Sequence, residues 1–124
     1  MKPEFEAYLC KKYSKIFRLK AHDIVGGYDY FGFECGDGWL VLLDTLCGEI
    51  QRHVDANNLL QVEARQVKEK YGGLRFYYTG GDDIIHELVK LAEDLSNITC
   101  DICGGAASSE VIQGWVVTRC NLHR

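Results

Sequence analysis

The last 25 residues of the chain have the sequence CDICGGAASSEVIQGWVVTRCNLHR, which runs from Cys100 to Arg124. A Cys-x-x-Cys-Gly turn opens this stretch, and a Cys-x-x-His pair stands near its end. Two thiolates on one tight turn can bind the same metal ion, and the second pair adds a third thiolate and an imidazole. These four side chains form a complete tetrahedral set for zinc. We therefore predict one structural zinc ion per chain, held by Cys100, Cys103, Cys120 and His123.

The segment between the two ligand pairs supports this prediction. Residues 111–117 are predicted to form a small β-hairpin that turns at Gln113-Gly114. A tight turn, a hairpin and a second ligand pair are typical of a zinc ribbon or a truncated treble clef. Four protein ligands leave no position for a catalytic water, so the zinc is expected to be structural. A zinc deaminase, which combines H-x-E with P-C-x-x-C, is excluded because His86 and Glu87 are adjacent and no proline precedes Cys100.

Cysteine usage and the first residues of the chain indicate the compartment. The charged first residues include no apolar signal segment, and the longest aliphatic stretch, residues 39–43, is too short to cross a bilayer. We expect a cytoplasmic protein with no membrane association, in which cysteines bind metal instead of forming disulfides. Cys10, Cys35 and Cys47 are expected to be small buried hydrophobic residues. A nucleophilic pair of Cys35 with His22 or His53 stays open.

The remainder of the chain predicts an α+β core domain, residues 1–97, with the zinc module of residues 98–124 packed on it. Apolar residues recur at helical spacing over residues 4–19, 38–55 and 82–96, with Asp37 and residues 80–83 as helix starts. Residues 22–37 are expected to form a loop or short strand whose aromatic side chains enter the core. These aromatic residues are Tyr28, Tyr30, Phe31 and Phe33, and the expected inward face of the third helix is Ile85, Leu88, Leu91, Ala92 and Leu95.

A second hairpin is predicted between these helices. Residues 60–67 and 74–79 form its strands, and the glycines in residues 69–73 supply the positive φ angles of a tight return. The expected fold is therefore helices packed on a small β-hairpin or antiparallel sheet. Arg75, flanked by aromatic residues, forms a candidate binding surface with Tyr71 and Tyr77; the alternative is an ordinary strand arginine that faces solvent.

Net charge restricts the possible partners. The chain carries a formal charge of −4, yet residues 1–20 contain six lysines and arginines and two glutamates. An acidic body disfavours non-specific binding to nucleic acid. The basic first helix, with Lys11, Lys12 and Lys15, keeps nucleic acid open as a partner.

Several motifs resemble those of small uncharacterised proteins of bacteriophages and prophages. They are Gly36-Asp37-Gly38-Trp39, the string QVKEKYGGLRFY at residues 66–77, Cys-x-x-Cys-Gly at 100–104, Gly114-Trp115, and Cys120 with His123. The resemblance covers residues 31–124. It implies a phage or prophage origin, a bacterial host cell and a zinc-binding C-terminus, but it implies no particular activity.

Three functions remain after these observations. The leading expectation is a non-enzymatic accessory protein that binds a macromolecule, first of all a host protein such as a component of a defence system. The alternative is a nucleic-acid-binding zinc protein or transcription regulator. The third is a small enzyme, which would require a pocket joining Tyr71, Arg75, Tyr77 and the zinc module.

Overall fold

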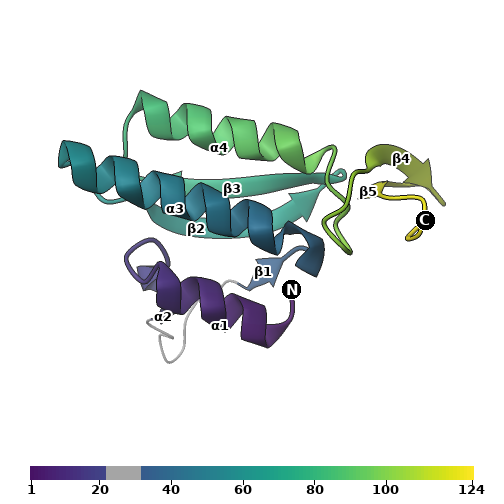
Figure 1. The fold of residues 1–124 in the computed structure, drawn as a ribbon, viewed down its shortest axis with the longest axis horizontal. Helices are drawn as coiled ribbons and strands as arrows, with labels where there is room; N and C mark the ends of the chain where they lie inside the picture. Colours follow the sequence, from purple (N-terminus) through teal and green to yellow (C-terminus); the bar gives the residue numbers. More distant parts are fainter. Residues whose placement is uncertain (22–31) are drawn as a thin grey trace.

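A three-stranded sheet packed against helices is followed by a separate two-stranded hairpin (Figure 1). The computed structural model describes residues 1–21 and 32–124. In chain order the elements are α1 (Pro3–Lys12), α2 (Arg18–Ala21), β1 (Phe33–Glu34), the 3₁₀ helix η1 (Asp37–Trp39), α3 (Leu40–Asn57), β2 (Glu63–Lys70), β3 (Gly73–Thr79), α4 (Asp83–Ser96), β4 (Ser108–Ile112) and β5 (Trp115–Arg119). The architecture is α+β, as the sequence predicts.

The larger sheet has the strand order β1-β2-β3. β2 and β3 form the predicted antiparallel hairpin, in which Val67 lies opposite Phe76. The short strand β1 adds to β2 in parallel and places Phe33 beside Val67. These three side chains are almost completely buried, so they belong to the sheet face that contributes to the core. β1 is a short strand within residues 22–37, where the sequence predicts a loop or short strand, but its parallel pairing with β2 was not predicted.

The turn of this hairpin is tighter than predicted. β2 extends to Lys70 and β3 begins at Gly73, which leaves Tyr71 and Gly72 as a two-residue turn. Their φ angles are +53° and +81°, so the second positive φ of the turn belongs to Tyr71 and not, as predicted, to Gly73. Two positive φ angles are typical of the two-residue turns that match the twist of paired strands. The turn therefore places the Tyr71 side chain at the tip of the hairpin, where it is 73% exposed.

Helix α4 covers the open edge of β3 as well as packing beside α3. The Ser96 hydroxyl accepts a hydrogen bond from the Leu74 amide at 2.8 Å, and a Glu93 carboxylate oxygen accepts one from the Phe76 amide at 2.9 Å. These side chains satisfy strand amides that would otherwise be open to another strand. α4 begins as predicted, because the Asp82 side chain accepts a hydrogen bond from the Ile85 amide at 3.1 Å.

The prediction of one helix over residues 4–19 is wrong. α1 ends at Lys12, and Tyr13 adopts the non-helical angles φ −118° and ψ 54°. The interruption allows Ile16 and Phe17 to enter the core, where both are fully buried. The Ile16 carbonyl also accepts a hydrogen bond from the Ala64 amide at 2.8 Å, so packing against the sheet overrides the local helical pattern.

Two expectations about the other helices also need correction. Asp37 does not cap the long helix; its carboxylate accepts a hydrogen bond from the Lys2 amide at 2.7 Å and thereby holds the N-terminal residues. Leu91 and Leu95 do not face inward but are 55% and 40% exposed. α4 lies at the sheet edge beside α3, and its apolar surface is wider than the surface that these elements cover.

Of the aromatic residues expected to pack from residues 22–37, Phe33 is buried as predicted. Tyr28, Tyr30 and Phe31 lie outside the described residues.

The C-terminal module contacts the body through closely packed backbone. The Gly38 amide donates to the Asp101 carbonyl at 3.0 Å, and the indole N–H of Trp39, which is fully buried, donates to the Thr99 carbonyl at 2.9 Å. A Cβ atom on Gly38 would lie 2.1 Å from the Cys100 carbonyl oxygen. The Gly-Asp-Gly-Trp motif is therefore the surface on which the cysteine turn packs.

We predict that Gly38→Ala destabilises the folded protein by about 2–3 kcal/mol, because the added methyl group forces two backbone segments apart. Urea denaturation measures this loss. Gly48→Ala, inside α3, is the matched control, since its Cβ would meet only the end of the Tyr13 side chain, with the hydroxyl oxygen at 3.2 Å and the ring carbon Cζ at 4.0 Å. Alanine favours helix, so this control should stay within about 1 kcal/mol of wild type. Equal stability of the two variants would contradict the importance of the Gly38 contact.

Candidate metal centre

Two short backbone turns bring the predicted ligands together. The Cys100 amide donates to the Gly105 carbonyl at 2.8 Å, and the Gly104 amide donates back to the Cys100 carbonyl at 2.9 Å. This turn carries the first two cysteines. The second pair follows β5 directly, in a turn closed by the His123 amide and the Cys120 carbonyl at 3.1 Å. The β4–β5 hairpin, which turns at Gln113-Gly114 as predicted, therefore returns the chain to the first turn.

The four predicted ligands lie close enough to hold one metal ion. Their ligand atoms are all within 4.8 Å of one another. The Cys100 sulfur lies 3.8 Å from Nδ1 of His123, the Cys103 and Cys120 sulfurs are 3.8 Å apart, and the Cys120 sulfur lies 3.1 Å from Nδ1 of His123. No disulfide links any of the six cysteines, all of which are among the described residues.

The thiols of the cluster influence one another's protonation. Burial alone would raise the pKa of Cys100, but backbone N–H groups of Cys120, Cys103 and Ile102 outweigh it and lower the pKa to about 6. The Gly105 amide acts to lower the pKa of Cys103, but burial and the neighbouring Cys100 and Cys120 thiols together raise it. Adjacent thiols cannot all lose their protons without a compensating positive charge, and a bound cation supplies that charge.

The surroundings hold the centre on the body while leaving one side near solvent. Cys100 is fully buried, whereas Cys103 is exposed. Beside the cluster, the Arg119 guanidinium donates to the Asp101 carboxylate at 3.2 Å, and the Asp101 amide donates to the Thr118 carbonyl at 3.0 Å. These bonds join the cysteine turn to β5 and fix the separation of the two ligand pairs.

The other predicted surface residues fall into two separate groups. Tyr71, Arg75 and Tyr77 share the β2–β3 hairpin, and Tyr71 lies at its tip beside β5. Lys11, Lys12 and Lys15 lie at the end of α1 and in the turn after it, at the opposite end of the view in Figure 1. Lys12 is already engaged: hydrogen bonds to the Tyr8 hydroxyl and to Asp44 raise its pKa.

The structure gives no support to Cys35 with His53 as a nucleophilic pair. Burial raises the pKa of the Cys35 thiol to about 12, which leaves almost no thiolate at neutral pH. Both ring nitrogens of His53 have other partners, Asp82 at 3.1 Å and the Asn57 side chain at 3.2 Å. His22, the other candidate partner, lies outside the described residues.

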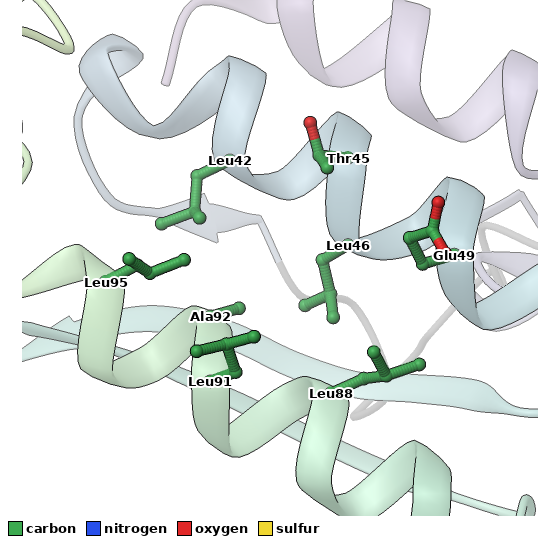
Figure 2. Close-up of a pocket in the computed structure, with 8 residues that line it drawn as sticks. All are labelled: Leu42, Thr45, Leu46, Glu49, Leu88, Leu91, Ala92 and Leu95. Atoms are coloured by element: carbon green, nitrogen blue, oxygen red, sulfur yellow. The ribbon is translucent and has the colours of Figure 1, made fainter.

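A second feature, the α3–α4 groove, was not predicted. Figure 2 shows Leu42 and Leu46 of α3 pointing toward Leu95 and Ala92 of α4. The groove has a cavity volume of about 90 Å³, and its lining residues are Leu42, Thr45, Leu46, Glu49, Leu88, Leu91, Ala92 and Leu95. The sequence signal is the width of the apolar surface on α4, which the helical pattern alone assigns wholly to the core.

No protein-family model, curated protein or solved structure matches the chain. Within the described ranges, no helix combines the length and the apolar character needed to cross a membrane.

We predict that Cys100→Ser lowers metal affinity by more than about 100-fold. Loss of a residue that only hydrogen-bonds to a metal ligand can already cost up to about 100-fold, and Cys100 is itself a predicted ligand. Native mass spectrometry of the purified protein, with and without added metal, gives the occupancy. Cys47→Ala is the matched control, since it removes a buried thiol from the core of α3 and should retain full occupancy. Full metal occupancy in Cys100→Ser would contradict the ligand assignment.

Proposed function

We propose that the metal is zinc, that its role is structural, and that the chain is a non-catalytic protein that binds another protein. Zinc–sulfur bonds of about 2.3 Å in a tetrahedral shell place neighbouring sulfurs about 3.8 Å apart. The separation of Cys103 and Cys120 agrees with that value. Three thiolates and one imidazole are also a donor set that binds zinc in preference to harder cations.

A structural role follows from the ligand number. Four side chains complete the coordination shell, so no position is left for the water that a catalytic zinc activates. The buried thiols elsewhere are poor nucleophiles, since burial raises the pKa of both Cys35 and Cys47. The zinc would instead order a module that is too small to fold without it.

One observation carries the proposal of a protein partner: an exposed apolar stripe along α4 and just beyond its end. Its members are separated by four, three, four and three residues, which is the spacing of a coiled-coil seam. Ile84, Leu91, Leu95 and Ile98 are between 40% and 59% exposed, and Leu88 is partly buried between them. Contiguous exposed apolar side chains of this kind mark interaction surfaces.

The shape of the α3–α4 groove favours a helix over a small molecule. Its volume of about 90 Å³ is well below the roughly 300 Å³ or more of ligand pockets. It can accept one aliphatic side chain between two helices, as in the knob-and-hole contacts of packed helices. Val41, which is 75% exposed, lies one residue before Leu42 and extends the apolar surface along α3.

Negative charges beside the stripe favour a partner with basic residues. Glu87 and Asp94 are exposed and directly precede Leu88 and Leu95, so they flank the stripe on its outer side. Asp83 adds a third exposed carboxylate on the same helix, against the single cation Lys90. We therefore commit to an amphipathic helix with basic residues along its polar edge. By the resemblance to phage proteins, this helix would belong to a bacterial host protein in the cytoplasm, such as a defence component.

We predict that a tagged chain retains one host protein from nuclease-treated bacterial lysate, and that the purified partner binds Leu91→Glu at least about 10-fold more weakly. Glu87→Lys should also weaken binding, because it places a cation beside the basic edge of the partner. Leu60→Glu is the control, since Leu60 is 77% exposed and lies outside the groove.

Two results would overturn the proposal. One is retention of no protein, or retention that Leu91→Glu leaves unchanged. The other is native mass spectrometry of the purified chain that finds a metal other than one zinc ion.

A further inference from the structure

A second hollow lies between the tip of the β2–β3 hairpin and the start of β5. Its volume is about 460 Å³, and it is lined by Lys68, Glu69, Lys70, Tyr71, Gly114, Trp115 and Val116. It shares no lining residue with the α3–α4 groove. Figure 1 shows the β2–β3 hairpin ending beside β5.

The two hairpins that form the hollow are bonded to each other. The Thr118 hydroxyl donates to the Gly72 carbonyl at 2.6 Å, in a buried position. A Cβ on Gly72 would lie only 3.1 Å from a methyl carbon of Val116, so β5 and the turn are in direct contact. The C-terminal module therefore holds one wall of the hollow against the other.

Two exposed aromatic side chains stand at this hollow. Tyr71 is 73% exposed and Trp115 is 75% exposed. Tyr71 also adopts a positive φ of +53°, which is unfavourable for a bulky residue and keeps its side chain at the tip of the turn. The Lys70 ammonium lies 5.6 Å from the centre of the Tyr71 ring.

Unpaired cations continue from the hollow along the outer face of the sheet. In the hairpin register Lys68 lies directly opposite Arg75, and Lys70 follows two residues later on the same face. Like charges directly opposite each other destabilise paired strands. Within residues 1–21 and 32–124, none of these three cations forms an ion pair. This face therefore carries positive charge that favours a negatively charged partner.

The nearby carboxylates do not cancel this charge by pairing with it. Glu69 in the hollow accepts a hydrogen bond from the Gly72 amide at 2.9 Å, and Glu63 pairs with Arg18. Glu34 of β1 is in register with Lys68 and adds one negative charge at the edge of the face. The basic residues gather here although the whole chain carries a net charge of −4.

We propose that this hollow and the adjoining sheet face bind single-stranded nucleic acid. One base enters between Tyr71 and Trp115, and the flanking phosphates lie against Lys68, Lys70 and Arg75. Stacking on exposed aromatic rings beside cations is how proteins hold single strands with little sequence preference. A duplex keeps its bases stacked inside and cannot place one in the hollow. Tyr77, on the same face and 43% exposed, is a further stacking surface along the strand.

The test is fluorescence anisotropy of labelled ten-nucleotide oligothymidine and oligouridine, with a ten-base-pair duplex for comparison. Zinc-loaded wild-type protein should bind both single strands and should bind the duplex at least about 10-fold more weakly. Trp115→Ala and Tyr71→Ala should each weaken single-strand binding by about 10-fold, whereas Trp115→Phe should recover most of the loss. Lys68→Gln with Lys70→Gln should reduce the slope of log affinity against log salt by about 0.7 for each phosphate that the variant no longer neutralises.

The matched control is Lys11→Gln with Lys15→Gln, which removes two exposed cations that do not line the hollow, one at the end of α1 and one in the turn after it. It should leave affinity for the single strands within about twofold of wild type. Zinc content and thermal stability are measured for each variant, so that a loss of binding caused by a folding defect is recognised. No single-strand binding at low salt, equal binding of the duplex, or an acidic peptide that competes equally well would overturn the proposal.

Discussion

The structure depends on one close contact, in which the backbone of η1 lies directly against the turn that carries Cys100 and Cys103. Gly38 donates a backbone hydrogen bond to the Asp101 carbonyl, and no side chain fits at Gly38 because the Cys100 carbonyl occupies that space. At Gly36 the Asp101 carbonyl excludes a side chain in the same way. Buried Trp39 adds the hydrogen bond from its indole to Thr99. The turn that carries Cys100 and Cys103 and the start of α3 are thereby one packed unit.

Two surfaces of opposite character result from this arrangement. The α3–α4 groove is apolar, with carboxylates along α4, whereas the outer face of the β2–β3 hairpin is basic and carries exposed aromatic side chains. The C-terminal module borders both. Thr118 of β5 is bonded to the Gly72 turn, and a further hollow joins Leu42, Thr45 and Leu95 of the groove to Cys103 and Gly104. Disorder in the module would therefore affect the two proposed binding surfaces together.

The sequence was most informative where a local pattern has a single physical solution. Two ligand pairs at metal-binding spacing predicted the cluster, and the paired residues Gly72-Gly73 and Gln113-Gly114 predicted both hairpins. The α4 start was also predictable, since the Asp82 cap is a local interaction. The predictions that failed concern features that depend on residues distant in the sequence. The interruption after Lys12 exists because Ile16 and Phe17 pack in the core, and no pattern within residues 4–19 indicates it.

Residues distant in the sequence also determine the role of the Gly-Asp-Gly-Trp motif and the exposure of Leu91 and Leu95, so local patterns did not predict either. A glycine required by a neighbour 60 or more residues away has the same local signature as a glycine at a helix start. An apolar helix face likewise has the same pattern whether it packs on its own core or remains open for a partner. The composition of α4 therefore gave the correct helix and the burial of Ile85 and Ala92, but it also assigned the exposed Leu91 and Leu95 to the core.

The most direct test of the central claim, that a metal ion at the four ligands orders residues 98–124 on the body, is amide hydrogen exchange with and without a chelator. On metal removal we expect loss of protection in β4 and β5 and at the amides of Gly38, Asp101 and Gly104, with recovery when zinc is restored. Amides in the buried middle of α3 should keep their protection. Unchanged exchange in residues 98–124 after complete metal removal would contradict the claim.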